Sequence, residues 1–174
     1  MKLEHYFLLS MPSLGGDYFA QALLYIYEHN QQGAMGLIVN RPSSMSLAEL
    51  NSQLGLSLNR NLLDTTVFEG GPVAPEQGFV LHSGNEAGQS YQVSSDIDIL
   101  KSIANNNGPS QFIVALGYAG WGPGQLEQEV MDNLWLTVPA EPDEVFMQPP
   151  EQRLNFVAEK MGINLNLMAP PGHA

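Results

Sequence analysis

Few residues of this chain have side chains suited to chemistry, and those few are spread along it. Arg41 directly follows an apolar stretch that ends at Asn40, and a guanidinium at such a strand end can hold a carboxylate through two parallel hydrogen bonds. His82 lies in a second apolar stretch, where an imidazole can serve as a base or a metal ligand. Tyr118 and Trp121 lie in a glycine-rich segment and offer flat rings to a ligand. These five residues are the ligand-binding site that the sequence predicts.

Each candidate also has a structural interpretation. Arg41 could form a salt bridge with an acid, Glu69 for example, which is the commoner use of an arginine near a protein surface. A lone histidine within a strand is more often a hydrogen-bonded, partly buried group than a ligand. His29 lies at the expected end of a helix, where a cationic side chain suits the negative end of the helix dipole. The sequence leaves both interpretations of Arg41 open.

The sequence contains none of the patterns that mark well-known catalytic or metal sites. There is no H-E-x-x-H motif and no Gly-x-Ser-x-Gly motif. There is also no cysteine, which excludes disulfides, thiolate zinc sites and cysteine nucleophiles. Paired acids such as Asp96 and Asp98 lie at expected helix starts, where capping explains them. The sequence therefore predicts no catalytic residue, no metal and no cofactor.

The glycine-rich segment Gly117–Glu127 is the most distinctive stretch of the chain. An apolar run leads into it and a helical pattern follows it, which predicts a strand, a tight loop and a helix whose first residue is Pro123. A phosphate-binding loop of the Walker type needs a lysine and then a serine or threonine after its last glycine, but glutamine and leucine stand there, and Glu127 would repel a phosphate. We expect a structural turn held by Trp121, with ligand binding by Tyr118 and Trp121 as the alternative.

The charge balance excludes some classes of partner. The net charge is −12, from 18 acidic and 6 basic residues. Nucleic acids and anionic membranes are bound through clustered lysine and arginine, so direct binding to either is not expected. The basic residues form no run: Lys2, Arg41, Arg60, Lys101, Arg153 and Lys160. The chain also lacks a signal-peptide pattern and any run of about 18 apolar residues, so the expected location is the cytoplasm.

The candidate residues must be positioned by helices and strands. The sequence predicts that these elements form one domain spanning residues 1–174, with 163–174 as an extended tail. The expected strands are residues 6–9, 34–40, 65–69, 78–83, 91–93, 111–116 and 134–138, with 65–69 and 78–83 forming a hairpin. The expected helices are residues 18–29, one capped by Ser46 that ends at Gly55, one capped by Ser95, one beginning at Pro123, and 151–161. This mixture predicts an α+β fold with a mixed, largely antiparallel, curved and barrel-like sheet flanked by helices.

Several of these stretches together resemble the YqgE/AlgH family of bacterial proteins. The resemblance rests on Leu9–Pro12, Glu28–Asn30, Gly33–Pro42, Gly70–Val73, Gly117–Glu127 and Gly172–Ala174, in the same order along the whole chain. It implies a cytosolic α+β domain with a strongly curved or barrel-like sheet and no established enzyme activity. Some members are labelled transcriptional regulators, a label that this acidic chain does not support as direct contact with DNA. The family has no settled catalytic residues to transfer.

The sequence therefore favours a non-enzymatic binding or regulatory protein, acting through contacts with a protein or a small molecule. The alternative is a small-ligand sensor or an enzyme with a pocket built from Arg41, His82 and Gly117–Glu127, joined by Asn40 and Glu69. These alternatives differ in geometry, because the pocket requires Arg41, His82 and one of the aromatic residues to converge.

Overall fold

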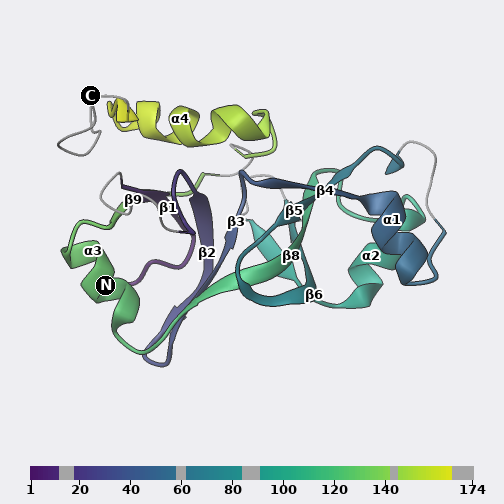
Figure 1. Cartoon of the computed structure of the whole chain (residues 1–174), viewed down its shortest axis with the longest axis horizontal. Helices are drawn as coiled ribbons and strands as arrows, with labels where there is room; N and C mark the ends of the chain where they lie inside the picture. Colours follow the sequence, from purple (N-terminus) through teal and green to yellow (C-terminus); the bar gives the residue numbers. More distant parts are fainter. Residues whose placement is uncertain (12–17, 58–61, 84–90, 142–144, 166–174) are drawn as a thin grey trace.

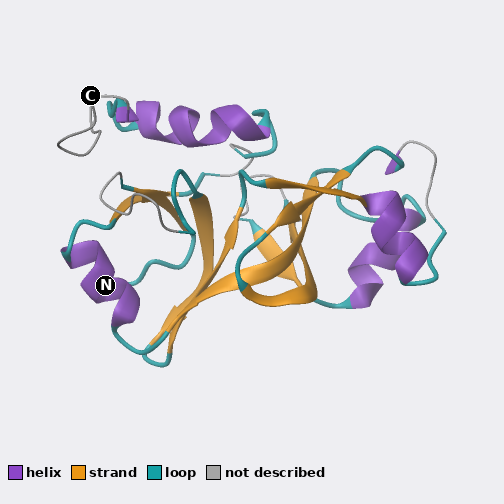
Figure 2. Cartoon of the chain, in the orientation of Figure 1, coloured by secondary structure: helices purple, strands orange, loops and turns teal. Residues whose placement is uncertain are grey.

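The computed structural model describes residues 1–11, 18–57, 62–83, 91–141 and 145–165. This part of the chain contains one mixed sheet of nine strands, together with four helices (Figures 1 and 2). The strands are β1 Tyr6–Ser10, β2 Leu23–Asn30, β3 Gly33–Ile38, β4 Pro42–Ser46, β5 Thr66–Glu69, β6 Val73–His82, β7 Gln92–Ser94, β8 Phe112–Trp121 and β9 Trp135–Pro139. The helices are α1 Leu47–Gln53, α2 Ile97–Ala104, α3 Gln125–Met131 and α4 Pro150–Lys160.

The long strand β8 joins the two halves of the sheet. Its first half lies between β5 and β6, and its last residues pair with β3, where Trp121 stands opposite Ala34. The strand order is β4-β5-β8-β3-β2-β1-β9, with β6 branching from β8 and β7 pairing with β6. Only the β5–β8 pair is parallel among the described strands. The α+β class with a mixed, largely antiparallel sheet is confirmed, and the sheet stays open rather than closing into a barrel.

The expected helix over residues 18–29 is wrong. Residues 23–30 form β2, which lies between β1 and β3. Residues 22–26 are all fully buried, so both sides of the chain are covered here. A continuous apolar run of this kind contains helical spacings by chance, and periodicity alone cannot separate a buried strand from a helix.

The expected hairpin of 65–69 with 78–83 is also wrong, because β8 lies between β5 and β6. The chain crosses β8 through Gly70 and Gly71, where the backbones approach closely. Gly117 has φ of +78°, and a Cβ there would overlap the carbonyl oxygen of Gly71. The strand continues past this crossing to Trp121, so most of the expected glycine loop is strand.

Two helix starts differ from the prediction and one agrees. Ser46 caps α1 by accepting a hydrogen bond from the backbone N–H of Glu49, as expected. The cap of α2 is Asp96, one residue after the predicted Ser95. Helix α3 begins at Gln125, because the preceding Gly124 has a left-handed conformation that ends the turn containing Pro123. The predicted tail lies outside the described residues from 166 onward.

Helices α3 and α4 lie against different parts of the sheet, and α1 and α2 lie together at another end of it (Figure 1). Val157 of α4 belongs to the largest buried cluster, and Leu126 of α3 packs with the tryptophans of β8 and β9. Leu47 of α1 and Leu100 of α2 share a third cluster over β5, β6 and β8. No helix within the described ranges is long and apolar enough to cross a membrane.

Candidate functional site

The five candidate residues do not meet in one place. Along β6, His82 stands opposite Phe112 of β8, whereas Val73 stands opposite Tyr118. Six residues of strand separate the two positions on β8, roughly 20 Å along the chain. His82 and Tyr118 therefore lie near opposite ends of the β6–β8 pairing.

His82 is a buried residue with hydrogen bonds at both ring nitrogens. Its Nδ1 donates to the carbonyl oxygen of Ser83 at 3.0 Å, and its Nε2 lies 2.9 Å from the hydroxyl of Ser94 on β7. Because the carbonyl can only accept, Nδ1 carries a proton, and in the neutral ring Nε2 accepts from the serine hydroxyl. This arrangement matches the structural interpretation of a lone histidine in a strand.

Asn40 joins the end of β3 to the start of β2. Its side-chain oxygen accepts from the backbone N–H of Leu23 at 2.9 Å, and its side-chain nitrogen donates to the carbonyl of Gln21 at 2.9 Å. Both halves of the carboxamide are therefore used in holding two neighbouring strands together.

Arg41 contacts an aromatic ring and not the expected acid. Its guanidinium carbon lies 5.0 Å from the centre of the Tyr18 ring, and its Nη2 donates to the carbonyl of Ala20 at 3.3 Å. The hydroxyl of Tyr18 donates to the Glu69 carboxylate, and no ion pair joins Arg41 to Glu69 within the described parts of the chain. Tyr18, Arg41 and Glu69 form what we call the Tyr18 cluster.

The electrostatics of the Tyr18 cluster keep the phenol protonated. Burial, followed by the hydrogen bond and negative charge of Glu69, raises the pKa of Tyr18 to about 12, against the opposing effect of Arg41. Tyr18 is 37% exposed, and Arg41 and Glu69 are half-buried. The cluster thus presents a cation, a hydroxyl and a carboxylate near the surface.

Trp121 is buried at the turn from β8 to α3. Its indole N–H donates to Glu129 Oε1 at 3.1 Å, and the indole N–H of Trp135 donates to the same oxygen at 2.9 Å. Gln125 donates to the other oxygen of Glu129 at 2.9 Å and accepts from the backbone N–H of Gly122 at 2.9 Å. These contacts hold the turn between β8 and α3 in place.

The ring of Tyr118 is half-buried and packs edge-on against Phe79, with ring centres 5.7 Å apart. It therefore belongs to the aromatic packing around β6 and β8. A binding role for Tyr118 and Trp121 stays a prediction.

Two buried polar residues have roles that the sequence analysis did not assign to them. His29 lies in β2, where its Nδ1 accepts from the backbone N–H of Leu3 at 2.9 Å and its Nε2 bonds to Glu127 of α3. No local pattern links His29 to Glu127, which is 98 residues away.

The second is Arg153, a residue of α4 whose side chain is buried. It donates to the carbonyls of Gln148 at 2.9 Å and Val39 at 2.6 Å, and its guanidinium carbon lies 5.2 Å from the centre of the Phe68 ring. Burial lowers the pKa of Arg153 to about 10. Its spacing of four residues from Val157 places it on the buried face of α4, a signal that the sequence did contain.

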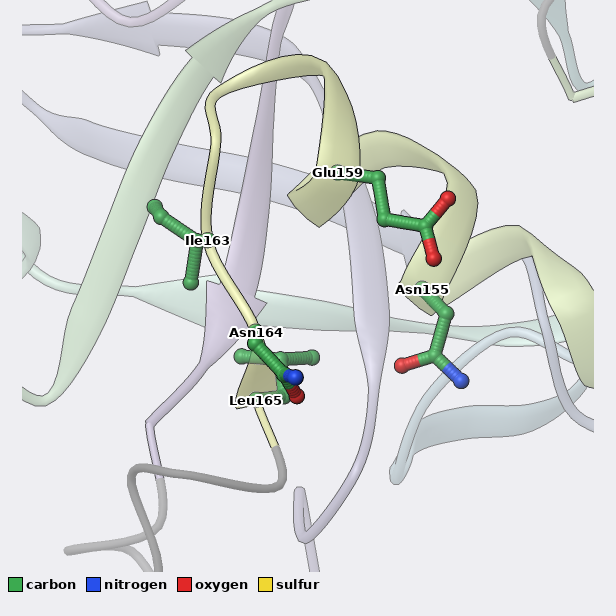
Figure 3. Close-up of a pocket in the computed structure, with 5 residues that line it drawn as sticks. All are labelled: Asn155, Glu159, Ile163, Asn164 and Leu165. Atoms are coloured by element: carbon green, nitrogen blue, oxygen red, sulfur yellow. The ribbon is translucent and has the colours of Figure 1, made fainter.

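A pocket lies at the C-terminal end of α4 (Figure 3). It is lined by Asn155, Glu159, Ile163, Asn164 and Leu165, none of which is a candidate residue. Within the described residues, no group of three or more His, Asp or Glu side chains could hold a metal ion.

The chain is similar to several known proteins. A family model described as AlgH-like matches residues 7–166. The UPF0301 protein AlgH of Pseudomonas aeruginosa is 45% identical over 184 aligned residues, covering 99% of this chain and 96% of that protein. A UPF0301 protein of Thioalkalivibrio sulfidiphilus is 43% identical, covering 97% of this chain and 95% of that protein.

Two solved structures are also similar to this chain over nearly its full length. The solution structure of AlgH from Pseudomonas aeruginosa matches this chain with a TM-score of 0.80 at 44% identity, covering 99% of this chain and 96% of that one. A crystal structure of a Corynebacterium diphtheriae protein matches with a TM-score of 0.74 at 18% identity, covering 98% and 93%, which is a likeness of fold alone. None of these names states an activity or a ligand.

Proposed function

The chain belongs to the AlgH-like family, and from this we propose that it is a non-enzymatic binding or regulatory protein that acts in the cytoplasm. The observation that supports the proposal is how the chemically capable side chains are used. Both ring nitrogens of His29 and His82, and both ends of the Asn40 carboxamide, are hydrogen-bonded to other parts of the fold. A group engaged in this way must break a structural contact before it can accept a proton or bind a ligand.

We propose the Tyr18 cluster as the recognition surface. Tyr18 and Arg41 are residue types that commonly dominate the energy of protein interfaces. Their stacking holds the guanidinium in place, which lowers the entropy lost when a partner binds. The partner is a protein or a small molecule with a group complementary to Arg41. A nucleic acid is not expected, because the net charge of −12 would repel it.

Capture of partners from the native cytosol tests the proposal when it is combined with variants of the cluster. Arg41→Gln removes the cation, and Tyr18→Phe keeps the ring but removes the hydroxyl that bonds to Glu69. Gln53→Leu, at an exposed position on α1, is the matched control. The proposal predicts a partner that wild type and the control retain and that Arg41→Gln loses while its thermal unfolding is unchanged. Equal capture by all four proteins would contradict it.

A small-ligand sensor or an enzyme is the second candidate. A pocket built from Arg41, His82 and the segment Gly117–Glu127 is less well supported. His82 and Tyr118 lie near opposite ends of the β6–β8 pairing. The observation in favour of this candidate is the Tyr18 cluster, where a phenol donates to a carboxylate beside a guanidinium. Mass spectrometry of small molecules that stay bound through native purification distinguishes the two. A compound present with wild type and absent with Arg41→Gln would favour the second candidate over a protein partner.

A further inference from the structure

Asn51 is a buried amide with no hydrogen bond. It lies in α1 and is 1% exposed, and neither its side-chain oxygen nor its side-chain nitrogen has a partner in the part of the chain that the structure describes. It shares the buried face of α1 with Leu47 and Leu50, which pack in the apolar cluster over β5, β6 and β8. Asn40, by contrast, uses both ends of the same functional group.

An amide in this position opposes the packing of α1. When α1 is closed, the donor and the acceptor of Asn51 are buried without a hydrogen-bond partner among the described residues, which is unfavourable. When α1 moves away, water can bond to both. Each unpaired group lowers the equilibrium constant for closure by about one order of magnitude, and Asn51 has two. Leu47 and Leu50 keep α1 closed, because their burial outweighs this penalty.

The chain on either side of α1 has features suited to hinges. The preceding strand β4 lies at the end of the sheet, and its pairing with β5 is interrupted between Pro42 and Ser46. Gly55 follows the helix in a left-handed conformation, with no atom within 4 Å of the position of a Cβ. Helix α1 itself has seven residues, too few to be stable in isolation, so it depends on its packing.

We infer that α1 is a hinged cover that opens locally while the rest of the fold stays intact, and that Asn51 sets how often it opens. Opening uncovers Leu47, Leu50 and the side chains beneath them, among them Val67 and Leu100. The Tyr18 cluster lies next to this device, since Arg41 directly precedes β4 and Glu69 ends β5, but no residue of the cluster belongs to α1. It makes the apolar surface over β5, β6 and β8 available only part of the time.

Native-state hydrogen exchange provides the test. The reporter amides are Leu54 and Leu56, whose N–H groups donate to the carbonyls of Leu50 at 3.1 Å and Asn51 at 2.8 Å. The reference is Val39, whose N–H donates to Leu23 in the centre of the sheet at 2.9 Å. We expect Leu54 and Leu56 in wild type to exchange faster than Val39, and with little dependence on denaturant, as local opening requires.

The variants assign the opening to Asn51. Asn51→Leu has a similar shape and no polar atoms, and it should slow exchange at Leu54 and Leu56 by at least about tenfold. Asn51→Ala also removes the amide and needs less space than leucine, so it is the second variant. Gln53→Leu on the exposed side of α1 should leave exchange at both reporters unchanged. The inference is overturned if the reporters and Val39 exchange together with the same denaturant dependence. It is also overturned if neither Asn51→Leu nor Asn51→Ala slows the reporters.

Discussion

The guanidinium of Arg41 lies over the ring of Tyr18, with its central carbon 5.0 Å from the ring centre. This contact takes the place of a salt bridge to Glu69, which bonds to the Tyr18 hydroxyl. A cation above an aromatic face is attracted by the electron density of the ring, so Tyr18 is the residue that connects the cation with the acid.

The ionisation of Tyr18 should report on this arrangement. Because burial and Glu69 raise its pKa from 10.0 to about 12, the stability linked to this hydroxyl is complete below pH 10 and is lost as the pH rises toward 12. Tyrosine-selective carbon NMR should show Tyr18 titrating near pH 12. Arg41→Gln should move the titration higher still, since Arg41 favours the ionised form. A normal tyrosine titration in wild type would contradict the geometry.

Glu129 should be important for stability because one of its oxygens accepts from two tryptophans. Glu129→Leu leaves the N–H groups of Trp121 and Trp135 without their acceptor, and we expect a loss of about 2–5 kcal/mol in the free energy of unfolding. Glu129→Gln retains an acceptor oxygen and should lose less. Urea unfolding followed by circular dichroism measures both. Glu159→Leu, an exposed acid on α4, is the control, and an equal loss in that variant would refute the assignment.

Two glycines with similar conformations should respond differently to alanine. Gly117 has φ of +78° and faces the carbonyl of Gly71, whereas Gly55 has φ of +72° and faces open space. Gly55→Ala should cost only the strain of a left-handed backbone, about 1–2 kcal/mol in the free energy of unfolding. Gly117→Ala adds the overlap with Gly71 and should cost about 3 kcal/mol or more. Similar losses in urea unfolding would mean that the crossing of the two backbones is looser than described.

His29 should be a neutral ring with its proton on Nε2. Its Nδ1 accepts from the backbone N–H of Leu3, so that nitrogen has a free electron pair, and Nε2 faces the carboxylate of Glu127. Nitrogen NMR of the imidazole rings at pH 7 distinguishes the two neutral forms. Leu3→Pro removes the donor to Nδ1 but leaves Glu127 facing Nε2, so the proton should stay on Nε2 in that variant, while a proton found on Nδ1 in wild type would exclude the hydrogen bond.

Much of the fold could be predicted from local patterns in the sequence. Ser46 caps α1 because its hydroxyl accepts from the backbone N–H of Glu49 three residues later, and this local pattern needs no knowledge of the rest of the chain. Strand β2 could not be predicted in the same way, because its residues 23–26 are buried by neighbours on both faces, and only the tertiary structure supplies those neighbours. Helical spacing within that apolar run led to the wrong element.

The candidate site could be predicted only in part, for a related reason. The sequence suggests a salt bridge between Arg41 and Glu69, but the structure places Tyr18 between them, and Tyr18 is 51 positions from Glu69 in the sequence. Arg153 had a local signal, since it lies on the face of α4 that also carries Val157. Asn51 had none, because an asparagine in a short helix is ordinarily exposed, and its burial is known only from the structure.

The affinity of a captured partner for the Arg41→Gln variant is the most direct test of the central claim, that this protein acts by binding through the Tyr18 cluster. The partner is the protein or small molecule that wild type retains, and its dissociation constant is measured by isothermal titration calorimetry. We predict binding at least about tenfold weaker than to wild type, with thermal unfolding unchanged and with Gln53→Leu matching wild type. A dissociation constant for Arg41→Gln equal to that of wild type would contradict the claim.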